Sequence, residues 1–162
     1  MGLPHTPYYA INIHGGKGDR SEKIVEVFKT LPPSIKNRLT LENDEKCYNV
    51  KQLLAISGRT GVPVVFDSHH YSFGVDDLSF DDAFNQAISS WGSIKPLQHL
   101  SNTEVGMENA SYNQKRAHSE MIRYIPELQL DAVRNDTIDL DVEAKLKNIA
   151  ILQMRKEFNI VC

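Results

Sequence analysis

Five short apolar runs, each followed by a helical pattern, constrain this chain more than any other feature of its sequence. The runs have the composition of β-strands and cover residues 8–14, 39–42, 62–67, 96–101 and 138–143. The spacing of apolar residues predicts helices over residues 21–31, 50–57, 80–91, 114–124 and 145–158. Strands that alternate with helices form parallel sheets, because a helix must carry the chain back between parallel neighbours. The sequence therefore predicts an α/β fold.

Acidic residues and histidines recur at or near the ends of these apolar runs. They are His14, Glu42, Asp67 with His70 three residues later, His99 and Glu143. In parallel α/β folds the carboxyl ends of the strands carry the functional residues. Each residue alone also suits a simpler role, such as a helix cap or a bond to a backbone carbonyl. Their repetition instead predicts a polynuclear metal site, in which carboxylates bridge cations and neutral imidazoles complete the coordination.

The number of β/α units bounds the architecture. A complete TIM-type barrel has eight units and takes about 250 residues, whereas this chain has 162 residues and opens almost directly on a strand-like run. We therefore expect residues 1–162 to be the C-terminal part of a β/α barrel. The expected fold is a partial TIM-type (β/α) barrel of about five units, with the N-terminal units missing. An open doubly wound sheet is the alternative.

Composition excludes several other classes of protein. Cys47 and Cys162 lie far apart without a C-x-x-C pattern, which argues against a disulfide framework and a thiolate zinc site. No apolar run reaches the length of a membrane span and no signal-peptide pattern is visible, so we expect no membrane association and a cytoplasmic location. The net charge of −3 gives no overall attraction to nucleic acid. It does not exclude DNA as a substrate, because carboxylates that hold metals count as negative in a metal-free tally.

Six segments together resemble the ultraviolet-damage endonucleases, the UvdE/UvsE-type DNA-repair family, which are barrel relatives of endonuclease IV. In chain order they are INIHGG (11–16), RLTLEND (38–44), GVPVVFDSHH (61–70), HLS (99–101), RAHS (116–119) and DLDVEAK (139–145). The resemblance runs over nearly the whole chain, and LEND followed by VFD-x-HH is its most specific part. It implies multi-metal hydrolysis of double-stranded DNA, with cleavage of the phosphodiester 5′ of an ultraviolet photolesion or an abasic site.

The resemblance also implies how two of three divalent metal ions are held. His14 and Glu42 would bind the first metal, and Glu42 would bridge to the second. Asp67, His99 and Glu143 would complete the second metal. Glu42, Asp67 and Glu143 are the candidate catalytic residues. The metal would be Mn²⁺, with Zn²⁺ or Mg²⁺ as alternatives, since mixed oxygen and nitrogen ligands suit these ions.

His70 and His118 would hold the third metal by the same resemblance. Clustered metals activate a bound water, so the reaction needs no nucleophilic side chain. Lys17 and Tyr71 are candidate DNA contacts, to a phosphate and to a base respectively. For these two residues, a solvated loop and packing within the protein are the alternative roles. The family usually has an active-site lysine where this chain has Leu97.

The N-terminal strands of the family have no counterpart in this sequence, although they supply a further metal-binding histidine and the lesion-probing residues. We therefore expect a separate chain to supply them, or this chain to be an inactive fragment. Another alternative is a different metal-dependent barrel enzyme, such as a xylose-isomerase-like sugar isomerase, which a third metal on His70 and His118 would argue against. His5 and His69 are not assigned to the site. His69 would point away from His70 if the segment is still extended, and a role behind the metal ligands or toward DNA is the alternative for it.

Overall fold

The computed structural model describes residues 2–16 and 20–161. In these residues the strands, in chain order, are β1 (Ile11–His14), β2 (Leu39–Glu42), β3 (Val64–Val65), β4 (Leu97–Leu100) and β5 (Asp139–Val142). All of them pair in parallel, in one sheet of order β1-β2-β3 and a second of order β4-β5. A parallel bridge between Asp67 and His99 joins the two sheets. The predicted α/β class with parallel strands is confirmed.

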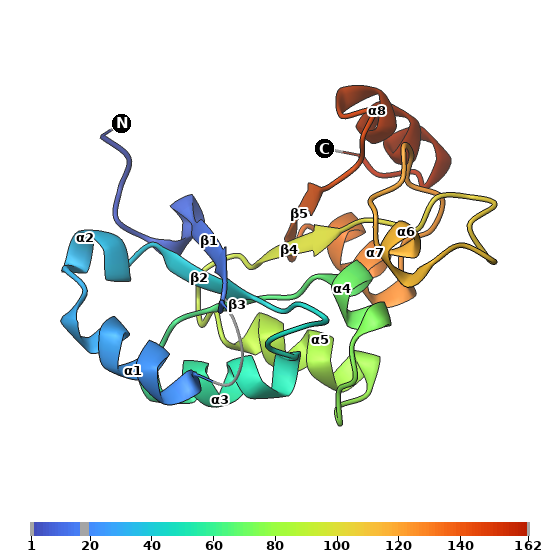
Figure 1. Cartoon of the computed structure of the whole chain (residues 1–162). Helices are drawn as coiled ribbons and strands as arrows, with labels where there is room; N and C mark the ends of the chain where they lie inside the picture. Colours follow the sequence, from blue (N-terminus) through green and yellow to red (C-terminus); the bar gives the residue numbers. More distant parts are fainter. Residues whose placement is uncertain (1, 17–19, 162) are drawn as a thin grey trace.

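Helices connect the strands and cover one face of the first sheet (Figure 1). They are the 3₁₀ helix η1 (Pro7–Tyr9) and the α-helices α1 (Ser21–Thr30), α2 (Pro33–Lys36), α3 (Val50–Thr60), α4 (Ser68–Phe73), α5 (Phe80–Ser89), α6 (Tyr112–Lys115), α7 (Glu127–Arg134) and α8 (Asn148–Glu157). Helix α3 lies between α1 and α5 and contacts both, and it also contacts β2 and β3. None of the described helices combines the length and the apolar character needed to cross a bilayer.

The alternation of side chains along β2 separates a core face from a polar face. Leu39 and Leu41 belong to the main hydrophobic core, together with residues of α1, α3 and α5. Thr40 and Glu42 point to the opposite face, because successive strand residues alternate. Both are nevertheless buried. The sheet therefore presents buried polar groups on the side that these helices do not cover.

Two polar side chains fix where helices begin beside this polar face. Asn49 forms a capping box with Gln52 at the start of α3, and Gly61 ends that helix in the left-handed conformation, at a φ of 75°. Asp67 caps α4 by accepting a hydrogen bond from the backbone N–H of His70 at 2.7 Å. The chain therefore turns from β3 into a helix directly after Asp67, where an extended segment was expected.

The region between β4 and β5 differs most from the sequence-based expectation. The helix predicted over 114–124 is wrong, because α6 ends at Lys115 and the chain then runs as a loop. The carbonyl oxygen of Asn102 accepts from Ser119 N, and its side-chain oxygen accepts from the backbone N–H groups of Arg123 and Tyr124. These bonds use the N–H groups that a helix would need. The α7 helix was not predicted.

Candidate metal centre

The strand register places the first three predicted ligands on one face of the sheet. His14 pairs with Glu42 across β1 and β2. Glu42 is opposite Val65 on β3, and Asp67 follows Val65 by two residues. An offset of two keeps a side chain on the same face of a strand. His14, Glu42 and Asp67 therefore share the polar face.

The same rule extends this face across the second sheet. Asp67 pairs with His99, and His99 is opposite Asp141 on β5. Glu143 follows Asp141 by two residues. The sequence placed His99 at or near the end of an apolar run. In the structure it is the third residue of β4. Asp141 was not predicted, and its Oδ2 lies 4.0 Å from His99 Nε2.

Glu42, Asp67 and His99 form the first group whose ligand atoms converge. All three are buried, and one ligand atom from each lies within 4.8 Å of the others. His99 Nδ1 lies 3.1 Å from Glu42 Oε1. Burial opposes the charge on both partners, but their mutual hydrogen bond outweighs it. It raises the pKa of His99 to about 9 and lowers the pKa of Glu42. The group thus carries a strong internal ion pair.

Asp67 is the most tightly held residue of this group. Its Oδ1 caps α4, and Asn43 bonds both of its backbone groups: Asn43 Oδ1 accepts from Asp67 N at 2.8 Å, and Asn43 Nδ2 donates to Asp67 O at 3.0 Å. Asp67 is 0% exposed, yet its Oδ2 has no hydrogen-bond partner among the described residues. A buried carboxylate oxygen left without a partner is costly, unless a ligand completes it.

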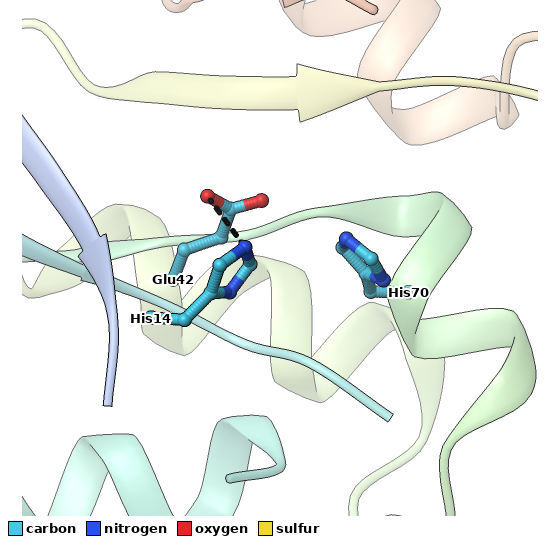
Figure 2. A group of neighbouring side chains, drawn as sticks. All are labelled: His14, Glu42 and His70. Atoms are coloured by element: carbon cyan, nitrogen blue, oxygen red, sulfur yellow. Dashed lines mark ion pairs between the residues drawn. The ribbon is translucent and has the colours of Figure 1, made fainter. Parts of the chain in front are cut away.

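His14, Glu42 and His70 form a second convergent group, also within 4.8 Å (Figure 2). His14 Nε2 lies 3.8 Å from Glu42 Oε2, and the rings of His14 and His70 lie 5.4 Å apart between centroids. Asn12 Nδ2 donates to the same Oε2 at 2.5 Å. The two oxygens of Glu42 therefore face different groups, Oε1 toward His99 and Oε2 toward His14.

His118 and Glu143 lie on the part of the polar face that the second sheet contributes, next to His99. Glu143 Oε2 lies 3.3 Å from His118 Nε2, and Glu143 Oε1 lies 3.9 Å from His99 Nδ1. His118 lies beyond α6, in a bridge to Thr103, rather than on the expected helix. The ring centroids of His70 and His118 are 6.5 Å apart. A metal shared by these two histidines stays a prediction.

Two residues beside His70, Glu45 and Arg116, were not predicted from the sequence, and His69 was left outside the site. Glu45 Oε2 lies 2.6 Å from His70 Nδ1, and Glu45 also forms an ion pair with Arg116. Burial raises the pKa of Glu45, but hydrogen bonds from its own backbone and from His70 outweigh burial and lower it. His69 is buried, and its Nε2 lies 3.0 Å from the carbonyl oxygen of Arg116. Burial lowers the pKa of His69.

His69 was expected to point away from His70 in an extended segment, but this segment is helix α4. The ring of His69 therefore contacts the rings of His70 and His118. Tyr71 packs between Phe66 and Phe80, and its hydroxyl donates to Leu78 O. Lys17 lies outside the described residues.

Lys95 does not replace the lysine that the family usually has at position 97. Its Nζ lies 2.5 Å from Asp136 Oδ1 and 2.9 Å from Asp139 Oδ1, and these hydrogen bonds raise the pKa of Lys95. Asp139 begins β5, whereas His99 and Glu143 lie toward the other end of the sheet. Leu97 itself shares the polar face with His99, two residues away.

The donor set of the polar face suits a divalent cation. Among the described residues, no ion pair joins Glu42 or Asp67 to a lysine or an arginine, although both carboxylates are buried. Buried carboxylates require a compensating charge. Without a metal, His99 provides this charge for Glu42, and a divalent cation would provide it for both carboxylates. Carboxylate oxygens with imidazole nitrogens are ligands of Mn²⁺ and Zn²⁺. Oδ2 of Asp67, which accepts no hydrogen bond from the part of the chain that the structure describes, provides a ligand atom without breaking a bond seen there.

Known proteins resemble the chain over nearly its full length. The model of the UV-endonuclease UvdE family matches residues 1–161. The UV DNA damage endonuclease of Nostoc sp. is 35% identical over 161 residues, which cover 96% of this chain and 47% of that protein. The UV DNA damage endonuclease of Deinococcus radiodurans is also 35% identical, over 96% of this chain and 49% of its own length.

A solved structure, that of SacUVDE, matches with a TM-score of 0.74 at 31% identity, over 94% of this chain and 53% of that one. The chain spans about half the length of the curated relatives it matches. The resemblance inferred from the sequence motifs is confirmed. The chain belongs to the UV-endonuclease UvdE family.

Proposed function

We propose that this chain is the metal-binding, C-terminal part of a DNA-repair endonuclease that cleaves the phosphodiester 5′ of ultraviolet photolesions or abasic sites. One observation carries the proposal: Glu42, Asp67 and His99 converge in a buried group, in which one carboxylate oxygen has no hydrogen-bond partner within residues 2–16 and 20–161. The curated relatives, whose names describe UV DNA damage endonucleases, support DNA as the substrate, and we propose that this DNA is double-stranded. A substrate of this kind agrees with the cytoplasmic location expected from the sequence.

The proposed metal ligands are the seven residues predicted from the sequence. They are His14, Glu42, Asp67, His70, His99, His118 and Glu143. A bound divalent cation, for which we propose Mn²⁺ before Zn²⁺ or Mg²⁺, supplies a water of lowered pKa and a charge that stabilises the leaving oxygen. Glu42 faces two ligand groups at once, which suits a bridging carboxylate. Glu143 is partly exposed, so that a phosphate has access to its side of the polar face.

We further propose that residues 1–162 form about five units of a TIM-type barrel, and that a chain with the missing N-terminal strands completes it. In the described residues β1 pairs only with β2, and both Ile11 and Ile13 are exposed on this edge. A cavity of about 420 Å³ beside this edge is lined mainly by apolar side chains, among them the exposed Val27 and Ile35. An unpaired strand and an apolar surface both favour a covering partner.

Family membership argues against the sugar isomerase alternative. The inactive fragment remains the competing proposal, and it differs in one outcome. A fragment that has lost its function gains nothing from the missing strands, whereas a split enzyme recovers metal binding and cleavage when they are supplied.

Metal analysis together with a nicking assay tests the proposal. The purified chain is loaded with Mn²⁺, its metal content is measured, and ultraviolet-irradiated supercoiled plasmid is assayed with and without the first half of the Deinococcus radiodurans relative. We expect partial metal content and poor nicking alone, because the open site lacks a ligand and admits water. Both should rise when the first half is added.

A matched pair of variants separates site effects from general ones. Asp67→Asn should abolish binding of one Mn²⁺ equivalent, whereas Asp77→Asn, at an exposed carboxylate paired with Lys51, should bind Mn²⁺ like the unaltered chain. Equal metal content in the two variants would contradict the proposed site. Strong lesion-specific nicking by the chain alone would contradict the need for further strands.

A further inference from the structure

A buried carboxylate that is not among the proposed ligands lies directly behind His70. The side chain of Glu45 is 1% exposed, and its Oε2 lies 2.6 Å from His70 Nδ1. Glu45 comes from the loop after β2, and His70 from α4, so two separate segments meet at this bond. In the sequence, this glutamate lies neither at the end of an apolar run nor within one of the six family-like segments.

The bond determines which nitrogen of His70 is free. An ionised carboxylate only accepts hydrogen bonds, so Nδ1 of His70 must carry the proton that it donates to Glu45. Nε2 is then left with its lone pair, which is the form that a metal ligand requires. Figure 2 shows the ring of His70 facing His14 and Glu42. A hydrogen bond of this kind orients a metal-binding histidine and increases its basicity.

Arg116 pairs with the other carboxylate oxygen of Glu45. Its Nε forms an ion pair with Glu45 Oε1, which offsets the cost of burying the carboxylate. Arg116 is itself fixed on two sides: its guanidinium lies 5.9 Å from the ring centre of Tyr112, and its carbonyl oxygen lies 3.0 Å from His69 Nε2. Arg116 precedes His118 by two residues, so this contact also holds the loop that carries His118.

We propose that Glu45 is a positioning residue for His70, and that Arg116 fixes Glu45 and thereby ties the loop of His118 to α4. The inference rests on the proposed metal-binding role of His70. Glu45 and Arg116 do not contact the metal, and their effect acts through the tautomer and the orientation of the histidine.

The tautomer of His70 can be measured without any metal. In ¹⁵N-histidine-labelled chain, the two ring nitrogens of each histidine are distinguished by NMR, and the signals of His70 are assigned by their loss in His70→Gln. We expect the Nδ1–H tautomer in the unaltered chain and a shift toward Nε2–H in Glu45→Ala. An Nε2–H tautomer for His70 in the unaltered chain would overturn the inference, and this measurement requires no substitution of Glu45.

Mn²⁺ affinity provides the second measurement. Loss of a partner of this kind weakens metal binding by about 10- to 100-fold, so Glu45→Ala should show this loss in one Mn²⁺ equivalent. Glu45→Gln should fall between Glu45→Ala and the unaltered chain, because the amide oxygen still accepts from Nδ1 but carries no charge. Glu22→Gln is the matched control, at an exposed carboxylate paired with Arg59.

The two proposals fail in different ways. Unchanged Mn²⁺ affinity in Glu45→Ala overturns the positioning role of Glu45. If the unaltered chain binds no Mn²⁺, the proposed function fails instead, and the NMR measurement alone decides whether Glu45 sets the tautomer of His70.

Discussion

Replacement of Asn43 by alanine tests how the structure holds Asp67 in place. Strand β3 ends at Val65, so no strand ladder reaches Asp67 from β2. The buried side chain of Asn43 takes over this role, with one bond from Asp67 N at 2.8 Å and one to Asp67 O at 3.0 Å. Asn43→Ala removes both bonds. Among the described residues this leaves the backbone N–H of Asp67 without a partner, whereas Asp67 O keeps the bond that it accepts from Tyr71 N at 3.0 Å.

The expected loss follows from these two bonds. An unsatisfied buried donor costs about 1–3 kcal/mol, and we take about 1.5 kcal/mol for the N–H of Asp67, because water can enter the space that the amide leaves. The lost bond to Asp67 O, which keeps its bond from Tyr71 N, costs about 1 kcal/mol. The free energy of unfolding should then fall by about 2.5 kcal/mol, and with a urea m-value of about 2 kcal/mol/M the midpoint of unfolding falls by about 1.2 M. Displacement of Asp67 should also weaken Mn²⁺ binding by about 10- to 100-fold.

Urea unfolding followed by circular dichroism measures the first effect, and Mn²⁺ titration measures the second. Asn85→Ala, at an exposed position of α5, is the matched control and should change the free energy of unfolding by no more than about 0.5 kcal/mol. A loss below about 1 kcal/mol in Asn43→Ala, with an unchanged m-value, would refute the account of how Asp67 is held.

Three further predictions concern the same framework. The pKa of His99 is raised from an ordinary 6.5 to about 9 by Glu42. The stabilisation of the folded chain by the His99–Glu42 pair is therefore complete below pH 6.5 and is lost as the pH rises through 9. The unfolding free energy of the metal-free chain should fall by about 3 kcal/mol over this window, and His99→Gln should remove this dependence. Trp91→Phe deletes the bond from Nε1 to Val64 O at 2.8 Å; it should cost about 2 kcal/mol and lower the melting temperature by about 6 °C in a thermal scan. Asn49→Ala removes the capping box of α3 and should cost about 1 kcal/mol in urea unfolding.

Local patterns in the sequence predicted much of the framework. Strand β2 and helices α1 and α5 were predicted nearly to their ends, because their apolar residues repeat with a clear period. His14, Glu42 and Glu143 were placed correctly at or just after strand ends. Their common face follows from parallel pairing alone, since even offsets in register preserve the side of the sheet.

Contacts between distant segments account for what the sequence did not reveal. Asp67 starts a helix through its own side chain, and this contact turned His69 inward instead of away. The helix expected over 114–124 is replaced by a loop, because Asn102 binds its backbone from outside the segment. Glu45 and Arg116 lie at no strand end, and only the folded chain brings them to His70.

The two oxygens of Glu42 have a thermodynamic consequence. One carboxylate belongs to both convergent groups, with Oε1 beside His99 and Oε2 beside His14. A cation at either position therefore changes the charge and orientation of a ligand at the other, so their affinities are linked and the linkage is reciprocal. Titration with metal should then show two interdependent equivalents. A substitution at His14 should alter the affinity of the equivalent held by Asp67, although these two side chains belong to different groups.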